Sequence, residues 1–128
     1  MVNEDQKPEQ KAESKEQPSA EQKSTVQDLL TDMKNNGFSG AVIRTDGLLL
    51  SSTISLNESG ASTFASLSNV FDALLKNLKD TQREIEISAG GIFLVLLPVD
   101  QYILCGVIKN REEKKNLREY ADKLKQML

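Results

Sequence analysis

The sequence predicts a protein of the α/β (α+β) class, a three-layer sandwich with the element order α-ββ-α-βββ-α. Stretches with helical spacing of apolar residues alternate with short β-prone runs over residues 25–128. Two of those runs, residues 92–97 and 102–108, are apolar on both faces, so helices must cover both faces of the sheet. We therefore expect the helix at 62–79 on one face and the first and last helices on the other.

The order begins with a helix over residues 25–36. Its apolar residues recur at i, i+3, i+4 and i+7: Val26, Leu29, Leu30 and Met33. Ser24 and Gln27 have the spacing of a capping box, which predicts the start of the helix. Gly37 follows the last turn, where glycine commonly ends a helix.

A β-hairpin comes next. Asp46-Gly47 lies between two β-prone runs, residues 40–45 and 48–53, and this dipeptide predicts a two-residue type I′ turn. Both turn residues would then have positive φ values. Residues 54–60 are expected to form a loop.

The second half contains a long helix, three strands and a closing helix. The long helix, residues 62–79, has a strongly apolar face: Phe64, Leu67, Val70, Phe71, Leu74, Leu75 and Leu78. Residues 84–88 alternate with period 2, which predicts a strand with one solvated face. In the strand at 102–108, Cys105 is expected to be a small core residue. The last helix opens at 109–112, and its buried face is marked by Leu117, Tyr120, Ala121, Leu124 and Leu128.

The chain of 128 residues divides into a polar tail and one domain. Residues 1–24 contain no Leu, Ile, Phe or Tyr and hold two of the three prolines, so we expect a disordered tail. It could serve as a tether or as a solubilising leader. Residues 25–128 form the domain.

The composition excludes several classes of activity. The chain has no histidine and a single cysteine, so we assign no metal ligand, cofactor site or catalytic residue. No G-x-x-x-x-G-K-[ST] motif is present, so the chain is not itself a P-loop GTPase. The net charge of −3 does not favour nucleic-acid binding, and the longest apolar run, residues 92–97, is too short for membrane insertion. With no apolar segment at the N-terminus, we expect a cytoplasmic protein.

The sequence resembles the roadblock / dynein light chain family over residues 25–128. The resemblance rests on Gly40-Ala-Val-Ile-Arg-Thr-Asp-Gly-Leu-Leu-Leu in the first hairpin, the long amphipathic helix, the strands over 84–108 and the closing helix. It implies a five-stranded antiparallel sheet and a homodimer or heterodimer, with two sheets joined at the strand 84–88 and two copies of the helix 62–79 side by side. Members of this family regulate small GTPases or serve as subunits of dynein and lysosomal scaffolds.

Two segments are candidates for a dimer interface. Ser62, Ser66, Asn69 and Ala73 form a stripe of small side chains, which would let another helix approach closely. The same stripe could instead be a solvated helix face. If the strand 84–88 lies at the sheet edge, Glu84 and Glu86 could repel other strands, or the strand could pair with its own copy.

The first functional hypothesis is a dimeric, non-enzymatic roadblock module that binds and regulates a Ras-like small GTPase. The alternative is a structural adaptor subunit of a motor or membrane-associated complex, with no effect on nucleotide hydrolysis. A third hypothesis, a small-ligand sensor using a sheet face, is the weakest because the apolar strands predict that helices fill both faces.

Overall fold

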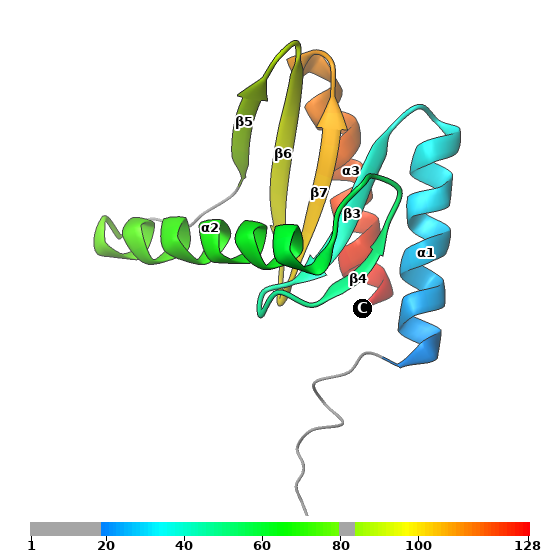
Figure 1. Cartoon of the computed structure of the whole chain (residues 1–128), viewed down its shortest axis with the longest axis horizontal. Helices are drawn as coiled ribbons and strands as arrows, with labels where there is room; N and C mark the ends of the chain where they lie inside the picture. Colours follow the sequence, from blue (N-terminus) through cyan, green and yellow to red (C-terminus); the bar gives the residue numbers. More distant parts are fainter. Residues whose placement is uncertain (1–18, 80–83) are drawn as a thin grey trace, which may run out of the picture.

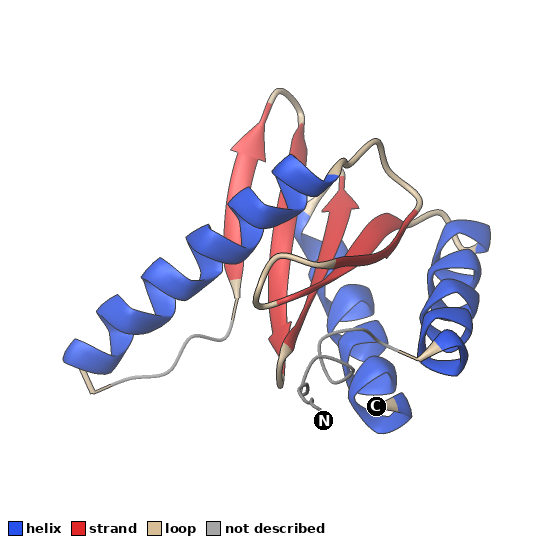
Figure 2. Ribbon diagram, turned by 60° about the horizontal axis from the view of Figure 1, so that its bottom comes forward, coloured by secondary structure: helices blue, strands red, loops and turns tan. Residues whose placement is uncertain are grey.

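The computed structural model describes residues 19–79 and 84–128. Within these ranges, one five-stranded antiparallel sheet has the strand order β4-β3-β7-β6-β5. Helix α2 lies on one face, and α1 and α3 cover the other (Figures 1 and 2). The predicted three-layer sandwich and its element order are confirmed.

Helix α1 (Ala20–Asn35) begins five residues earlier than the sequence predicts. The Ser19 hydroxyl accepts a hydrogen bond of 3.0 Å from the Gln22 N–H, and the Gln22 side chain accepts one of 3.3 Å from the Ser19 N–H. The capping box predicted at Ser24 and Gln27 is therefore wrong, and residues 20–24 belong to the helix rather than to a tail. Residues 1–18, the rest of the predicted tail, lie outside the described residues.

Strands β3 (Ser39–Arg44) and β4 (Leu49–Ser52) form the predicted hairpin, but the predicted type I′ turn is wrong. Gly47 has a φ of +101°, whereas Asp46 does not have a positive φ. The Gly47 N–H donates 2.8 Å to the Arg44 carbonyl, so the connection is a three-residue loop that ends on a left-handed glycine. The Asp46 carboxylate accepts two hydrogen bonds from the Arg44 guanidinium, at 2.6 and 2.9 Å, and fixes this loop.

The remaining elements match the predicted order with shifted ends. They are α2 (Glu58–Asn77), β5 (Ile85–Ala89), β6 (Ile92–Val99), β7 (Tyr102–Ile108), the 3-10 turn η2 (Arg111–Glu113) and α3 (Lys114–Met127). Helix α2 starts four residues before the predicted position because the Asn57 side chain accepts a hydrogen bond of 2.8 Å from the Gly60 N–H. The predicted loop over 54–60 therefore ends at Asn57.

Two apolar cores lie on opposite faces of the sheet. On the α1 and α3 face, Leu30, Leu104 and Leu117 are fully buried. On the α2 face, Ala61 and Ala65 pack on strand residues that include Cys105. Burial raises the pKa of the Cys105 thiol to about 12, so the cysteine is the core residue that the sequence predicts.

Candidate association surface

Helix α2 is only partly covered by the sheet. It crosses one end of the sheet and then extends beyond the edge strand β5 (Figures 1 and 2). Its buried residues, Ala61, Ala65 and Ser68, all lie within the first eleven of its 20 residues. These small side chains let the helix pack closely on the strands, so small residues in α2 serve helix–sheet contact.

The second half of α2 and its C-cap residue, Leu78, expose large apolar side chains to solvent. Four residues form this surface, which we call the apolar row: Val70 (64% exposed), Phe71 (40%), Leu74 (51%) and Leu78 (68%). These residues belong to the apolar face that the sequence predicts for this helix, and the sheet leaves this part of the face uncovered. At about 100° per residue, the row lies to one side of the residues that face the sheet. The apolar arc of the helix is wider than the surface that the sheet covers.

Strand β5 is an edge of the sheet. It pairs with β6 on one side, and no described strand pairs with its other side. The side chain of Ile85 packs toward the α2 face. The overhanging part of α2 and the open edge of β5 thus lie next to each other (Figure 2).

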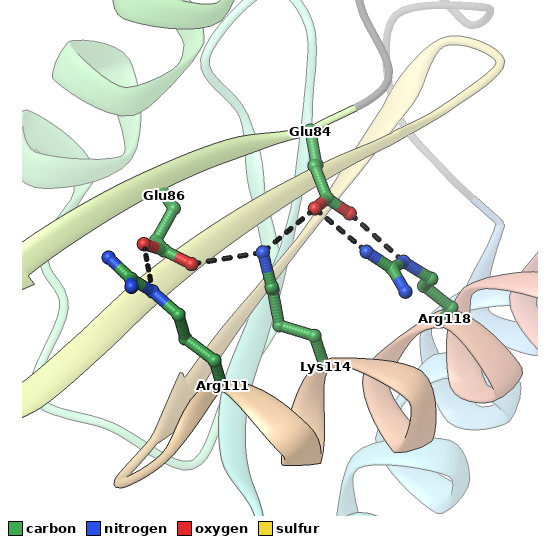
Figure 3. Close-up of polar contacts among 5 residues, drawn as sticks. All are labelled: Glu84, Glu86, Arg111, Lys114 and Arg118. Carbon is green, nitrogen blue, oxygen red and sulfur yellow. Dashed lines mark hydrogen bonds and ion pairs between the residues drawn. The ribbon is translucent and has the colours of Figure 1, made fainter.

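The carboxylates of the edge strand are held by cations from the other face. The Arg118 guanidinium donates two hydrogen bonds to Glu84, at 2.9 and 3.1 Å, and Arg111 donates one of 2.9 Å to Glu86. The Lys114 ammonium lies between the two carboxylates, 3.1 Å from Glu84 and 3.0 Å from Glu86 (Figure 3). We call these five residues the clasp.

The clasp shifts the titration of its members. The hydrogen bonds from Arg118 to Glu84, and the Lys114 ammonium beside Glu86, hold the pKa of each carboxylate below its usual value. The same contacts raise the pKa of Lys114 and of Arg118. Glu84 and Glu86 are therefore neutralised within the chain and do not act as unpaired charges on a solvated edge.

The predicted stripe of small residues lies on a different flank of α2 from the apolar row. The Asn69 amide donates a hydrogen bond of 2.9 Å to the Thr45 carbonyl in the β3–β4 turn. A Cβ atom added to Gly47 in the same turn would lie 3.3 Å from the Ser62 Cα. Ser66 and Ala73 are exposed. None of these contacts tests whether a partner covers this flank, so the small-residue interface stays a prediction.

Sequence reasoning missed the apolar row, although the sequence carried a signal for it. Apolar residues occur at positions 70, 71, 74, 75 and 78, which together cover about 140° of the helix circumference. A helix that packs on one face of a single sheet needs an arc of only about 100°. The excess apolar width indicates a second contact surface.

Among the described residues, no group of three or more His, Cys, Asp or Glu side chains is placed to hold a metal ion. No helix in the described ranges is long and apolar enough to cross a membrane. A hollow of about 570 Å³ lies between β6 and α3, but Glu84 and Arg118 in its wall are already paired with each other.

Several solved structures have the same arrangement of helices and strands. Myxococcus xanthus MglB superposes with a TM-score of 0.72 at 17% identity, over 87% of this chain and 92% of that chain. A Roadblock/LC7 domain from Streptomyces avermitilis has a TM-score of 0.57 at 14% identity, over 79% of this chain and 92% of the other. The chain has the roadblock fold.

The roadblock fold is also similar in structure to profilin. Acanthamoeba castellanii profilin IB superposes with a TM-score of 0.63 at 17% identity, over 80% of this chain and 98% of profilin. No protein-family model matches the sequence, and no curated protein matches it either. Because one fold supports many functions, the function has to be argued from the surface rather than from the superposition.

Proposed function

We propose that this chain is a dimeric, non-enzymatic roadblock module that binds and regulates a Ras-like small GTPase in the cytoplasm. One observation carries the proposal: a roadblock fold that exposes an apolar row on α2 beside an open strand edge. Exposed apolar patches and open edges are typical of protein–protein contact surfaces. The alternative adaptor function would use the same surface without changing nucleotide hydrolysis.

The surface has the properties that an isologous dimer requires. In a two-fold arrangement, β5 would pair antiparallel with β5 of a second copy, because each copy presents the same edge. The overhanging half of each α2 would then extend over the partner, where the apolar row could be covered. A heterodimer with another roadblock protein would use the same two elements.

Protein contact is favoured over catalysis by the chemistry of the chain. The thiol of Cys105 is buried in the sheet, and its pKa of about 12 makes it a poor nucleophile near neutral pH. The acidic residues of the β5 region are engaged with cations of η2 and α3, which leaves them unsuited to proton transfer. The class of partner, a small GTPase, comes from the family resemblance of the sequence, and the fold supports that resemblance.

The proposal predicts a change in the nucleotide cycle of a GTPase. Purified Ras-like GTPases from the organism that carries this chain are mixed with saturating full-length protein. The rates of GTP hydrolysis and of nucleotide exchange are then measured. We expect one of the two rates to change, because the bound module would stabilise one arrangement of the GTPase loops.

The variant Leu74→Glu places a charge in the apolar row and should abolish the effect if the dimer is the active form. Binding without a change in either rate would support the adaptor function instead. Absence of binding to every GTPase tested would contradict both the GTPase partner and its regulation.

A further inference from the structure

On the face of the sheet that α3 covers, strand β5 is attached differently from the other four strands. The apolar core of that face includes residues of β3, β4, β6 and β7, and among the described residues it includes none from β5. Toward α3 the β5 region presents Glu84 and Glu86, and these meet the clasp cations (Figure 3). Ion pairs therefore take the place of apolar packing between the edge strand and α3.

The same carboxylates would oppose pairing of two β5 edges if they were unpaired. Neighbouring strands lie about 5 Å apart, so a β5–β5 pair would gather four carboxylates on one face of the joined sheet. Like charges that face each other across strands are destabilising. The cations that offset this repulsion, Arg111, Lys114 and Arg118, all come from η2 and α3 of the same chain.

Lys114 is the central contact of the clasp. Its ammonium is the cation that both carboxylates share, and its side chain is only 20% exposed. The Oε1 atom of Glu86 is buried and accepts no hydrogen bond, so the Lys114 ammonium at 3.0 Å supplies its compensation. Loss of the ammonium would leave the buried Oε1 atom without its own partner, although Arg111 would still bind Oε2 of the same carboxylate, and an uncompensated buried oxygen is costly.

We propose that the clasp is an assembly latch, through which α3 holds β5 in place and neutralises its carboxylates so that the edge can pair with a second copy of this chain. The inference rests on the dimer of the proposed function, and it adds that α3, which lies away from the pairing edge, controls whether that edge is usable. Lys114 is the positioning residue of the latch.

The test measures self-association of the full chain by sedimentation equilibrium. Lys114→Gln removes the shared charge, Lys114→Arg keeps it, and Lys115→Gln makes the same charge change at the exposed neighbouring position. We expect Lys114→Gln to raise the dimer Kd by about tenfold or more. The other two variants should stay within about twofold of the wild-type Kd, because they leave the clasp charges in place.

A second measurement tests the latch in a chain that does not self-associate. In the Leu74→Glu background, hydrogen exchange is followed for the amides of Ile85–Ala89 and, as an internal reference, for those of Tyr102–Ile108. We expect Lys114→Gln to speed exchange in β5 and to leave β7 unchanged. If Lys114→Gln lowers protection throughout the chain, Arg111→Gln replaces it, since the Arg111 side chain is 67% exposed and its loss should not unfold the domain.

The outcomes separate this inference from the proposed function. A wild-type dimer whose Kd and β5 exchange are both unchanged by Lys114→Gln would overturn the latch and leave the dimer standing. A wild type that stays monomeric would contradict the dimer and with it the role in assembly. In that case, faster β5 exchange in Lys114→Gln would still support the claim that α3 holds β5 in place. Unchanged exchange would overturn that claim too.

Discussion

Glu84 and Glu86, at the start of the edge strand β5, could either repel a neighbouring strand or attach β5 to the rest of the chain. As unpaired carboxylates they would protect a sheet edge by repulsion. Paired with Arg111, Lys114 and Arg118, they tie that edge to the neighbouring helix instead. The sequence did not indicate these ion pairs, because the partners lie about 25 to 34 residues away along the chain.

The clasp also predicts a pH dependence of stability. Because Arg118 and Lys114 hold the pKa of Glu84 below its usual value of 4.5, its ionised form stabilises the folded chain at neutral pH. That contribution is complete above the unfolded pKa and is lost as the pH falls through the folded pKa. Urea unfolding from neutral pH to about pH 3 should therefore show Glu84→Gln less stable than wild type at neutral pH, with the gap closing in acid.

The control for this measurement is Glu119→Gln, which removes an exposed carboxylate from α3, the helix that carries Lys114 and Arg118. It should change the free energy of unfolding little at any pH in the range. A gap between Glu84→Gln and wild type that is constant across the range would contradict the assignment of the ionised carboxylate as the stabilising form.

The start of α1 makes a prediction at the scale of one element. Ser19 caps the helix, whereas Ser24 lies within it and is exposed. Ser19→Ala should lower the free energy of unfolding by about 1 kcal/mol, because the first turn loses a hydrogen-bond acceptor. Ser24→Ala should be neutral or slightly stabilising, because alanine favours helix interiors. Thermal unfolding of the two variants shows which serine caps the helix. An equal loss of stability in Ser19→Ala and Ser24→Ala would contradict the observed helix start.

The order of elements could be predicted from sequence because it depends on apolar periodicity, which the chain shows clearly. The ends could not, because they depend on single polar contacts. The first turn of α1 contains Glu21 and Gln22 and no buried residue, so nothing apolar marked it as helix. Asp46 likewise accepts hydrogen bonds from Arg44, and this contact helps to fix a loop that differs from the type I′ turn its dipeptide favours.

The candidate surface was predictable only in part. The pattern placed the candidate interface on the helix that forms α2 and on the strand 84–88, and the fold confirms that this strand lies at an edge of the sheet. The flank of α2 could not be chosen, because periodicity gives the width of an apolar arc and does not say how much of it the sheet covers. Phe71 and Leu74 belong to the predicted apolar face and are exposed in the fold, where the helix extends beyond the last strand.

At the scale of the whole molecule, the single chain leaves two surfaces uncovered, the overhanging part of α2 and the open edge of β5. Four large apolar side chains of α2 and its C-cap face solvent beside a strand that, among the described strands, pairs on one side only. A second copy would supply both missing contacts at once, because a two-fold axis repeats each element for the other chain. The central claim of the account is therefore that the chain functions as a dimer through the apolar row and β5.

The most direct test is the solution mass, measured by light scattering at micromolar concentration for the wild type, Leu74→Glu and Ser66→Arg. The account predicts a wild-type mass of twice the chain mass of 14.2 kDa, a monomeric Leu74→Glu and a dimeric Ser66→Arg. Leu74 is 51% exposed, so its substitution should remove the contact without unfolding the chain. A dimer that survives Leu74→Glu and is lost in Ser66→Arg would contradict the account and place the interface on the flank of small residues.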